Sequence, residues 1–518
     1  MTDFTSLPHH LYTAAQVQQL DRIAIESFDI PGFKLMQRAG AVAYATLSEQ
    51  WPQVRELLIF AGGGNNGGDG YIIAGLAAAE GISVTVIQLA DGESLRGDAK
   101  TALDWAQQHA IKFQDFSESP GDIASHGQTV LVDAMLGTGL DREVQGRYAA
   151  AIDWINQSGL PVLAVDIPSG LHATTGAMMG CAVQADVTVS FIGIKQGMLT
   201  HRGRDFIGKL HFSDLEIPTA VYRTADAPPP SAERFDINVA APNLLPRQRS
   251  SHKGSHGHVV VVGGDHGFGG AVLMAAEAAQ RSGAGLVSLI TRSGHRVAML
   301  ARRPEVMVAG TEDDDSRTAE LLGRASVICI GPGLGRGQWS QALLQQVLAQ
   351  NIANKTPLVV DADALTLLAD WGEMNQLRKR DTWILTPHPG EAATLLDCSV
   401  EDIQQDRFAA VKKLQHKWGG ACLLKGSGSL TCHLKNAEQI IGLCTEGNAG
   451  MASGGMGDVL SGVIAGLLAQ GLALEDSLRC AVAVHGEAGD LASEAQGQRG
   501  LLATDLLPYI QRLVNPSL

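Results

Sequence analysis

Short apolar runs alternate with longer amphipathic segments along most of the chain, which is the pattern of parallel α/β domains. Runs of four to six apolar residues predict buried strands, and apolar residues recurring every three or four positions predict helices. In the first half this predicts strands over 57–61, 84–88, 130–133, 162–166 and 187–191, and helices over 13–27, 34–50, 70–80 and 97–109. A second series predicts strands over 259–262, 287–291, 327–330, 358–361, 383–386 and 421–425, with helices over 270–281, 458–469 and 477–495.

A proline-rich segment separates the two series. Three consecutive prolines, Pro228 to Pro230, lie in a stretch without apolar periodicity, which is typical of an interdomain linker. We therefore predict a domain over 1–225, a linker over 226–237 and a second domain over 238–518. No short repeat is visible, so the pattern indicates two different α/β domains and excludes a solenoid.

Composition narrows the class of protein. A hydrophobic fraction of 45% is enough for large buried cores and excludes disorder as the dominant state. The net charge of −15 argues against a dedicated nucleic-acid binder, although loops and helix ends can still bind phosphates. The first residues lack the pattern of a signal peptide, and the longest apolar stretch, 459–474, is too short for a membrane span. We expect a cytoplasmic protein.

Glycine is over-represented, with 60 residues in a chain of 518 against about 7% in an average protein. Many of these glycines follow predicted strands, in clusters at 62–70, 137–139, 263–270, 331–337, 426–428 and 454–457. Backbone N–H groups in such turns and at the helix starts behind them bind anions well. The clusters therefore indicate phosphate-bearing ligands.

The first cluster reads GGGNNGGDG over 62–70, between an apolar strand and an alanine-rich helix. It has the position of a Rossmann phosphate turn without its GxGxxG spacing. Asn65, Asn66 and Asp69 add polar groups at a strand end, where parallel sheets bind ligands. Two more strands end in Asp133 and Asp166. Each of these three strand ends could be a simple turn or helix cap. Three of them in one domain favour a ligand-binding site.

These three motifs, NNGGDG, LVDAMLGTGL and AVDIPSG, resemble the NAD(P)H-hydrate epimerase domain over about residues 10–220. The resemblance implies a Rossmann-like three-layer fold and Asp166 as the catalytic proton-transfer residue. It implies a K⁺ ion held by Asn66, Asp133 and Ser169. It also implies that the hydrate is bound by Asn65, Asn66, Gly67, Gly68, Asp69, Gly137, Thr138, Gly139, Leu140, Asp141, Arg142, Glu143 and Asp166.

A second proton-transfer group for the epimerase is left unassigned. Some relatives carry a lysine in the segment that matches 137–143. Here the nearby cation is Arg142, whose guanidinium does not deprotonate easily.

The most informative motif of the second half is GGMGD, at 454–458. Its glycines precede an apolar helix, so their N–H groups would form an anion cradle at the positive end of that helix. Asp458 at its edge can act as a base toward a substrate hydroxyl. A simple glycine-flanked helix cap is the alternative.

Other strand ends of this half carry further polar groups. Lys425 enters a Gly/Ser loop, KGSGS, that suits a nucleotide phosphate but lacks the Walker spacing. His388 lies on a rigid turn between two prolines, or is only an exposed loop histidine. Glu391 behind it is a helix-start carboxylate or an indirect ligand of a magnesium–phosphate complex.

Together with GPGLG and TPHPGE, these motifs resemble the NAD(P)H-hydrate dehydratases of the ribokinase-like superfamily over about residues 240–515. The resemblance implies ADP with Mg²⁺ as co-substrate, since bacterial forms use ADP and eukaryotic forms prefer ATP. ADP is expected on Lys425, Gly426, Ser427, Gly428, Ser429 and Gly457, and the hydrate near Ala271, Gly333, Leu334, Gly335, His388 and catalytic Asp458.

The leading hypothesis is a bifunctional enzyme that epimerises the R and S hydrates of NAD(P)H and dehydrates the S form, converting ADP to AMP and phosphate. One alternative is a ribokinase-like vitamin or sugar kinase with an N-terminal nucleotide-binding regulatory module. Another is a purely sensing or protein-binding first domain. We expect hydrated NADH (NADHX), hydrated NADPH (NADPHX) and ADP as partners, no nucleic acid, no membrane, and a homo-oligomer.

Overall fold

The computed structural model describes residues 7–116, 128–244, 246–313, 315–375 and 379–515, and the chain divides into two compact units, Met1–Glu233 and Arg234–Leu518. The division falls inside 226–237, the segment predicted as a linker. That segment is not irregular throughout, because β10 (Ala232–Phe235) and the start of α7 (Ile237–Ala240) lie in it. Within the described ranges, no helix has the length and apolarity that a membrane crossing requires.

The first unit is built on a seven-stranded sheet in the order β4-β3-β2-β5-β6-β7-β9, in which every neighbouring pair is parallel. The strands of this sheet are β2 (Glu56–Ala61), β3 (Ser83–Gln88), β4 (Lys112–Asp115), β5 (Thr129–Ala134), β6 (Val162–Val165), β7 (Val187–Phe191) and β9 (Lys209–Ser213). The unit also contains two short strands outside this sheet, β1 (His10–Tyr12) and β8 (Ile194–Lys195). Its helices are α1 (Ala14–Ser27), α2 (Gly32–Gln50), α3 (Asn65–Ala79), α4 (Gly97–Ala106), α5 (Gly146–Gln157) and α6 (Gly203–Phe206).

Helices cover both faces of this sheet and make the three layers that were predicted. One core joins α1 to α4 with one face, and a second joins α5 with the other. The chain reverses its direction of winding between β2 and β5. Such a reversal opens a crevice at the carboxyl ends of the strands, which is where open α/β sheets bind ligands.

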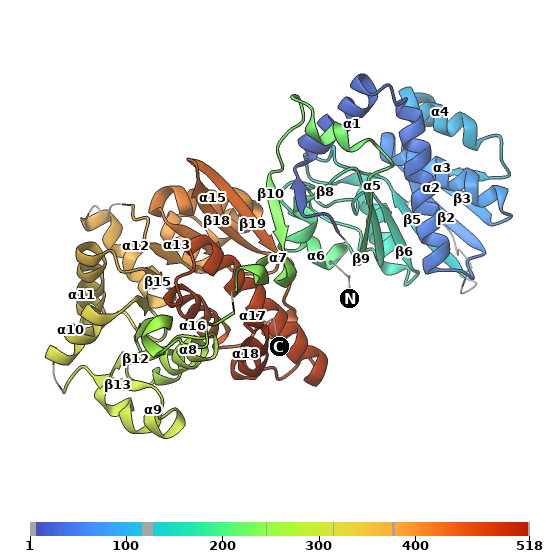
Figure 1. Ribbon diagram of the computed structural model, residues 1–518. Coiled ribbons are helices and arrows are strands. Elements are labelled where there is room, and N and C mark those ends of the chain that lie inside the picture. The colour runs from blue at the N-terminus through green and yellow to red at the C-terminus, as the bar shows by residue number, and fades with distance from the viewer. Residues whose placement is uncertain (1–6, 117–127, 245, 314, 376–378, 516–518) are drawn as a thin grey trace. The chain divides into compact units, whose positions relative to one another are not determined.

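The second unit holds a longer sheet in the order β13-β12-β11-β14-β15-β16-β17-β18-β19 (Figure 1). The pairs are parallel up to β17, and β17, β18 and β19 are antiparallel. The strands are β11 (His258–Val262), β12 (Leu286–Thr291), β13 (Met307–Gly310), β14 (Val327–Ile330), β15 (Leu358–Val360), β16 (Trp383–Leu385), β17 (Ala421–Leu424), β18 (Ser429–Lys435) and β19 (Glu438–Cys444).

The longer helices of this unit surround that sheet. Its helices after α7 are α8 (Gly269–Arg281), α9 (Arg296–Arg302), α10 (Asp315–Arg324), α11 (Gln338–Asn354), α12 (Asp363–Asn375), α13 (Pro389–Leu396), α14 (Val400–Gln405), α15 (Arg407–Trp418), α16 (Met456–Ala469), α17 (Leu474–Gln496) and α18 (Leu507–Leu513). Helices α8, α16 and α17 share one core with the strands. A Cβ at Gly462 would lie 2.1 Å from the Ala275 carbonyl oxygen, so α16 approaches α8 very closely. This contact fixes the position of α16.

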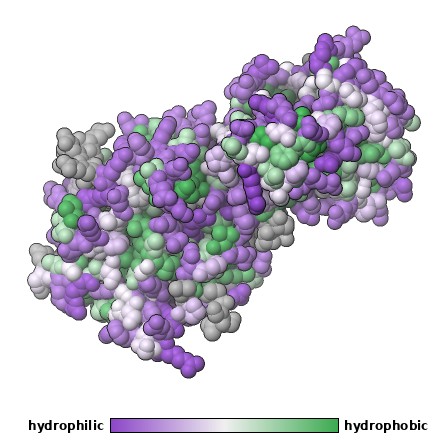
Figure 2. All heavy atoms as spheres, turned by 45° about the horizontal axis from the view of Figure 1, so that its top comes forward, coloured by the Kyte–Doolittle hydropathy of each residue, from purple (hydrophilic) through white to green (hydrophobic). Residues whose placement is uncertain are grey.

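The α/β class and the predicted strands are confirmed, with ends that differ by one residue at most. One helix start was wrong, because α3 begins at Asn65 and not at Gly70, so the predicted loop residues 65–69 form its first turns. Glycine disfavours helices in general, but tight packing requires it here, as described below. The surface turned to the viewer in Figure 2 is mostly hydrophilic, with apolar residues in separate small patches.

Candidate active sites

A cavity of about 680 Å³ lies in the first unit, where residues that follow β2, β5 and β6 converge. Its volume is in the range of small-molecule sites. The predicted hydrate-binding residues that line it are Asn65, Asn66, Asp69, Gly137, Thr138, Gly139, Leu140, Asp141, Arg142 and Asp166. Gly67, Gly68 and Glu143 are not among the lining residues.

Gly67 and Gly68 serve packing. A Cβ on Gly67 would lie 2.1 Å from the Gly62 carbonyl oxygen, and one on Gly68 would lie 2.6 Å from Met36. Any larger residue would push the first turn of α3 away from β2. These glycines therefore allow the N-terminus of α3, where N–H groups are unpaired, to border the cavity.

Asp166 forms a buried ion pair with Lys195 at the wall of the cavity. Asp166 follows β6 with a φ of 66°, a conformation that non-glycine residues rarely adopt and that clusters at functional sites. Lys195 lies on β8 and is fully buried. Its ammonium contacts the Asp166 carboxylate and donates to Ser190 Oγ at 3.1 Å and to the Phe191 carbonyl at 3.2 Å.

Lys195 was missed in the sequence, where Arg142 was the cation considered. Arg142 lines the cavity but is exposed. The signal for Lys195 was a single lysine in the apolar stretch FIGIKQGM, since a lysine that cannot reach water needs a partner.

Two further carboxyl groups, Asp69 and Asp21, line the same cavity. Burial, and then the charges of Asp166 and Asp21, raise the pKa of Asp69 well above its usual value. Burial and the charge of Asp166 also raise the pKa of Asp21. Burial thus favours the neutral form of these carboxyl groups beside the Asp166–Lys195 pair, so the cavity places a group suited to donate a proton next to one suited to accept it.

The three predicted potassium ligands lie at the ends of the same strands. Ser169 donates to Asp133 from its amide at 2.7 Å and from its hydroxyl at 2.6 Å. Burial raises the pKa of Asp133 to about 6, although the Ser169 bonds lower it. Both polar atoms of the buried Asn66 amide lack a hydrogen-bond partner among the described residues. An unpaired buried carbonyl oxygen is costly unless something binds it, so this site fits a hard cation.

In the second unit, the N-terminus of α16 carries the predicted base. Gly455 caps this helix with a φ of 90°, and Gly457 and Asp458 lie in its first turn. Burial and the charge of Asp361 raise the pKa of Asp458 to about 7. A base with a pKa near neutrality is well matched to proton abstraction at physiological pH.

Lys425 reaches this helix end from β17. Its ammonium lies 3.3 Å from the position that a Cβ of Gly457 would take. It donates to Asp361 Oδ1 at 2.7 Å, while Ser461 on α16 donates to Asp361 Oδ2 at 2.6 Å. Burial lowers the pKa of Lys425, but Asp361 and Glu391 outweigh burial and the net shift is upward. Lys425 was predicted as a nucleotide ligand, whereas Asp361 was missed.

His388 and Glu391 form the other edge of this cluster. His388 caps α13, where its Nδ1 accepts from the amides of Gly390 and Glu391, so the predicted rigid turn is present. Glu391 lies 3.8 Å from the Lys425 ammonium. Burial raises the pKa of Glu391 to about 7.

The predicted nucleotide loop, Lys425 to Ser429, connects β17 to β18. Gly426 and Gly428 have φ values of 139° and 62°, which glycine adopts at little cost. Ser429 Oγ donates to the Gly426 carbonyl at 3.0 Å and closes the turn.

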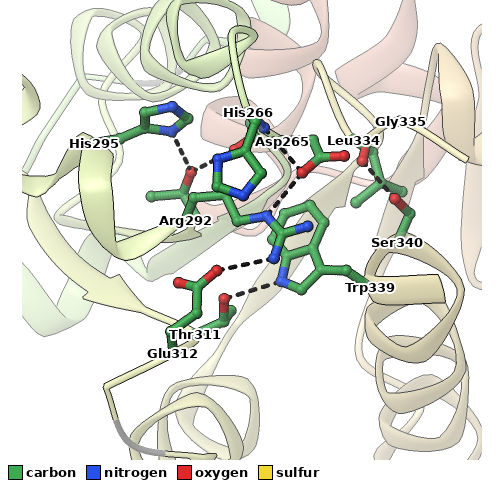
Figure 3. A network of polar contacts seen from close by, with 12 residues as sticks. Asp265, His266, Arg292, His295, Thr311, Glu312, Leu334, Gly335, Trp339 and Ser340 are labelled. Atoms are coloured by element: carbon green, nitrogen blue, oxygen red, sulfur yellow. Dashed lines mark hydrogen bonds and ion pairs between the residues drawn. The ribbon is translucent and has the colours of Figure 1, made fainter. Parts of the chain in front are cut away.

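A polar network supports the predicted hydrate-binding loop, 333–335 (Figure 3). Asp265 donates from its amide to the Gly333 carbonyl at 2.7 Å, and its side chain accepts from Arg292 Nε at 2.7 Å. Arg292 also donates to Glu312 and stacks on Trp339 with 4.1 Å between the guanidinium carbon and the ring centroid.

Two contacts hold this loop against α8 and the start of α12. Gly333 lies against Ala271, since a Cβ on Gly333 would be 3.2 Å from the Ala271 Cβ. Gly335 donates its amide to Asp363 Oδ2 at 2.9 Å, and the charge of Asp363 raises the pKa of Asp458. The predicted hydrate-binding loop is thus bonded to a carboxylate whose charge acts on the predicted base.

Comparison with known proteins finds a family match in each unit. Residues 32–197 match the family described as YjeF-related protein N-terminus, and residues 259–512 match the NAD(P)H-hydrate dehydratase family. A protein of Coxiella burnetii named bifunctional NAD(P)H-hydrate repair enzyme Nnr is 43% identical over 98% of this chain and 99% of its own length. Its namesake in Escherichia coli is 40% identical over 100% of this chain and 97% of its own length.

Among solved structures, a ribokinase-like superfamily protein from Enterococcus faecalis aligns with a TM-score of 0.50 and 32% identity, covering 55% of this chain and 96% of that one. This confirms a ribokinase-like second unit. Because these two relatives are at least 40% identical and are matched over nearly their whole length, the chain belongs to the family of bifunctional NAD(P)H-hydrate repair enzymes.

Proposed function

We propose that the first unit interconverts the R and S hydrates of NADH and NADPH, and that the second unit dehydrates the S form while ADP becomes AMP and phosphate. The observation that carries this proposal is the N-terminus of α16, where a base with a pKa near 7, Asp458, lies beside the Lys425 ammonium. The family membership supports both activities. It does not favour the vitamin or sugar kinase considered as an alternative.

In the epimerase, inverting a hydroxyl-bearing carbon requires a proton acceptor and a proton donor. Asp166, held by Lys195, is the acceptor that the cavity offers. Asp69, whose neutral form burial favours, is the donor. Lys195 supplies a buried cation in this cavity, and it holds the Asp166 carboxylate in one orientation.

Asn66, Asp133 and Ser169 would hold a potassium ion, which the unpaired Asn66 amide supports. When bound, K⁺ would supply a fixed positive charge at the base of the hydrate site. The side chains of these three residues, from three strand ends, would then fix the loops 62–66 and 135–139 relative to each other.

In the dehydratase, Asp458 takes the proton of the hydrate hydroxyl as its oxygen bonds to the β-phosphorus of ADP, and AMP leaves. The C–O bond to phosphate then breaks while the neighbouring carbon loses a proton to the departing phosphate, and the new C=C bond regenerates the dihydronicotinamide. The Gly457 amide and the Lys425 ammonium neutralise the negative charge that develops on the phosphoryl oxygens. When bound with ADP, Mg²⁺ would supply further charge neutralisation, and Glu391, 3.8 Å from the Lys425 ammonium, is the side chain that would help to hold it.

The decisive experiment follows the dihydronicotinamide absorbance after mixed R and S hydrates and ADP are added to the full chain. The wild type should convert both forms. Asp458→Asn should abolish recovery and leave R–S interconversion intact, and Asp166→Asn should limit recovery to the S form. No recovery by the wild type with either ADP or ATP would contradict the proposal. A stable phosphorylated product would favour the kinase alternative. A homo-oligomer and a cytoplasmic location remain predictions.

A further inference from the structure

Arg407 lies directly beneath the predicted nucleotide loop. It is the first residue of α15 and is 1% exposed, one of the largest fully buried side chains of the protein. Its Nη2 donates to the carbonyl oxygens of Leu424 and Lys425, both at 3.2 Å, and its Nη1 donates to Gln404 Oε1 at 2.9 Å. One planar group therefore holds the two carbonyls at which β17 enters the loop.

The bond to the Lys425 carbonyl decides where the Gly426 amide points. The structure contains no cis peptide bonds within its described ranges, and in a trans peptide the C=O and the next N–H point in opposite directions. The Lys425 carbonyl faces Arg407, so the Gly426 amide faces away from the interior and toward the loop. The guanidinium also packs against Gly426, since a Cβ there would be 3.1 Å from Nη2.

The position of Arg407 also places a positive charge under the loop. Burial lowers the pKa of Arg407 to about 10, so the guanidinium stays protonated at neutral pH. A charge inside the protein acts through a lower dielectric than one in water and attracts phosphates more strongly. Arg407 thus offers both an oriented amide and a nearby cation.

We propose that Arg407 is a positioning residue for the nucleotide: it holds the 424–426 backbone so that the Gly426 amide faces the ADP phosphates. This rests on the proposed dehydratase function and adds to it a residue outside every motif of the sequence. It predicts that Arg407 governs ADP binding and not hydrate binding.

The test is Arg407→Lys in the full chain. Lysine keeps the charge but has no planar fork, so it cannot hold both carbonyls and Gln404 together. We expect the KM for ADP to rise about tenfold or more, as for the loss of one or two charged hydrogen bonds. The KM for the S hydrate and kcat at saturating ADP should stay within about twofold. Epimerisation, which belongs to the other unit, should not change.

Arg380→Lys is the matched control. Arg380 lies near the opposite end of β17, where it donates to Asn351 Oδ1 at 2.7 Å and stacks over Trp383. This variant should leave both KM values unchanged.

Two outcomes would overturn the inference: an unchanged KM for ADP, or equal rises in both KM values, which would make Arg407 a general core residue. If Arg407→Lys does not fold, Gln404→Met removes one acceptor only. Gln404→Met should raise the KM for ADP and leave the KM for the hydrate unchanged. An unchanged KM for ADP in this variant would overturn the inference. Failure of the proposed function itself would be seen separately, as a wild type inactive with ADP.

Discussion

Asp361 holds Lys425 at the N-terminus of α16. Their ion pair, at 2.7 Å, keeps the ammonium beside Gly457, and the Ser461 hydroxyl ties the same carboxylate to α16. Burial raises the pKa of Asp361, but the charge of Lys425 outweighs burial and the net shift is downward. Asp361 thus stays ionised and keeps the cation on the side where a phosphoryl group would be transferred.

Asp361→Asn should therefore reduce kcat for dehydration by about tenfold to a hundredfold, because Lys425 loses its anchor in a site that depends on charge placement. Breaking a buried pair also destabilises a protein by about 3–5 kcal/mol, so thermal unfolding should be measured beside the rate. The exposed Asp370 provides the control. Asp370→Asn should match the wild type in dehydration rate and in thermal unfolding. An Asp361→Asn enzyme with full activity would show that Asp361 does not position Lys425.

The pH dependence of dehydration should report Asp458. Its pKa is raised to about 7, so the carboxylate that accepts the proton is present above that pH and is lost below it. The rate at saturating substrates should fall about tenfold for each pH unit below 7 and level off above it.

Glu391 also has a pKa near 7, and Asp361, Asp363 and Lys425 are the other charged groups that influence Asp458. Glu391→Gln separates the two titrations. The acidic limb should persist in this variant, and its disappearance would assign the limb to Glu391.

Lys195→Met should slow R–S interconversion by about a hundredfold or more, the range expected when a proton-transfer group is no longer held in place. Dehydration of the pure S hydrate should be unchanged. Lys195→Arg should recover part of the rate, because a cation again faces Asp166. Lys209→Met alters an exposed lysine of the same unit and should have no effect. Equal rates in the Met and Arg variants would mean that Lys195 acts through its packing and not through its charge.

Potassium should stimulate epimerisation through Asn66. In the wild type, replacing K⁺ by tetramethylammonium should lower the rate of R–S interconversion, while Asn66→Ala should be slow in both salts. For each enzyme, the quantity to measure is the rate in K⁺ divided by the rate in tetramethylammonium. A folding defect would lower both rates and leave this ratio unchanged. An Asn66→Ala enzyme that still responds to K⁺ would exclude this ligand.

Gly67 and Gly64, which lie within three residues of each other, test how tightly the start of α3 is packed. Gly67→Ala should destabilise the protein by about 1–3 kcal/mol, as overpacking does, because its Cβ would lie 2.1 Å from the Gly62 carbonyl oxygen. Gly64 has open space around its Cβ position and a φ of −105°. Gly64→Ala should therefore unfold at the wild-type temperature, as followed by circular dichroism.

Apolar runs predicted the buried strands well because a parallel sheet covered on both faces needs continuous apolar segments. The start of α3 was wrong because intrinsic propensity counts glycine as a helix breaker, whereas contacts with Met36 and Gly62 admit only glycine there. Only the fold could show those contacts.

The motif residues were found, and their buried partners were not. Lys195 is 29 residues from Asp166, and Asp361 is 64 residues from Lys425. No local pattern connects such pairs. Arg407 likewise gives no signal in the sequence, where it is one basic residue at the start of an amphipathic helix.

The pairing of β1 with β10 has a consequence for biosynthesis. Leu11 pairs with Ala232, so the two ends of the first unit close against each other through one short ladder. When residue 235 leaves the ribosome, β1 to β10 have all been made, while β11 to β19 of the second unit have not yet emerged. Since domains generally fold in the order of their synthesis, the epimerase would mature first on the nascent chain.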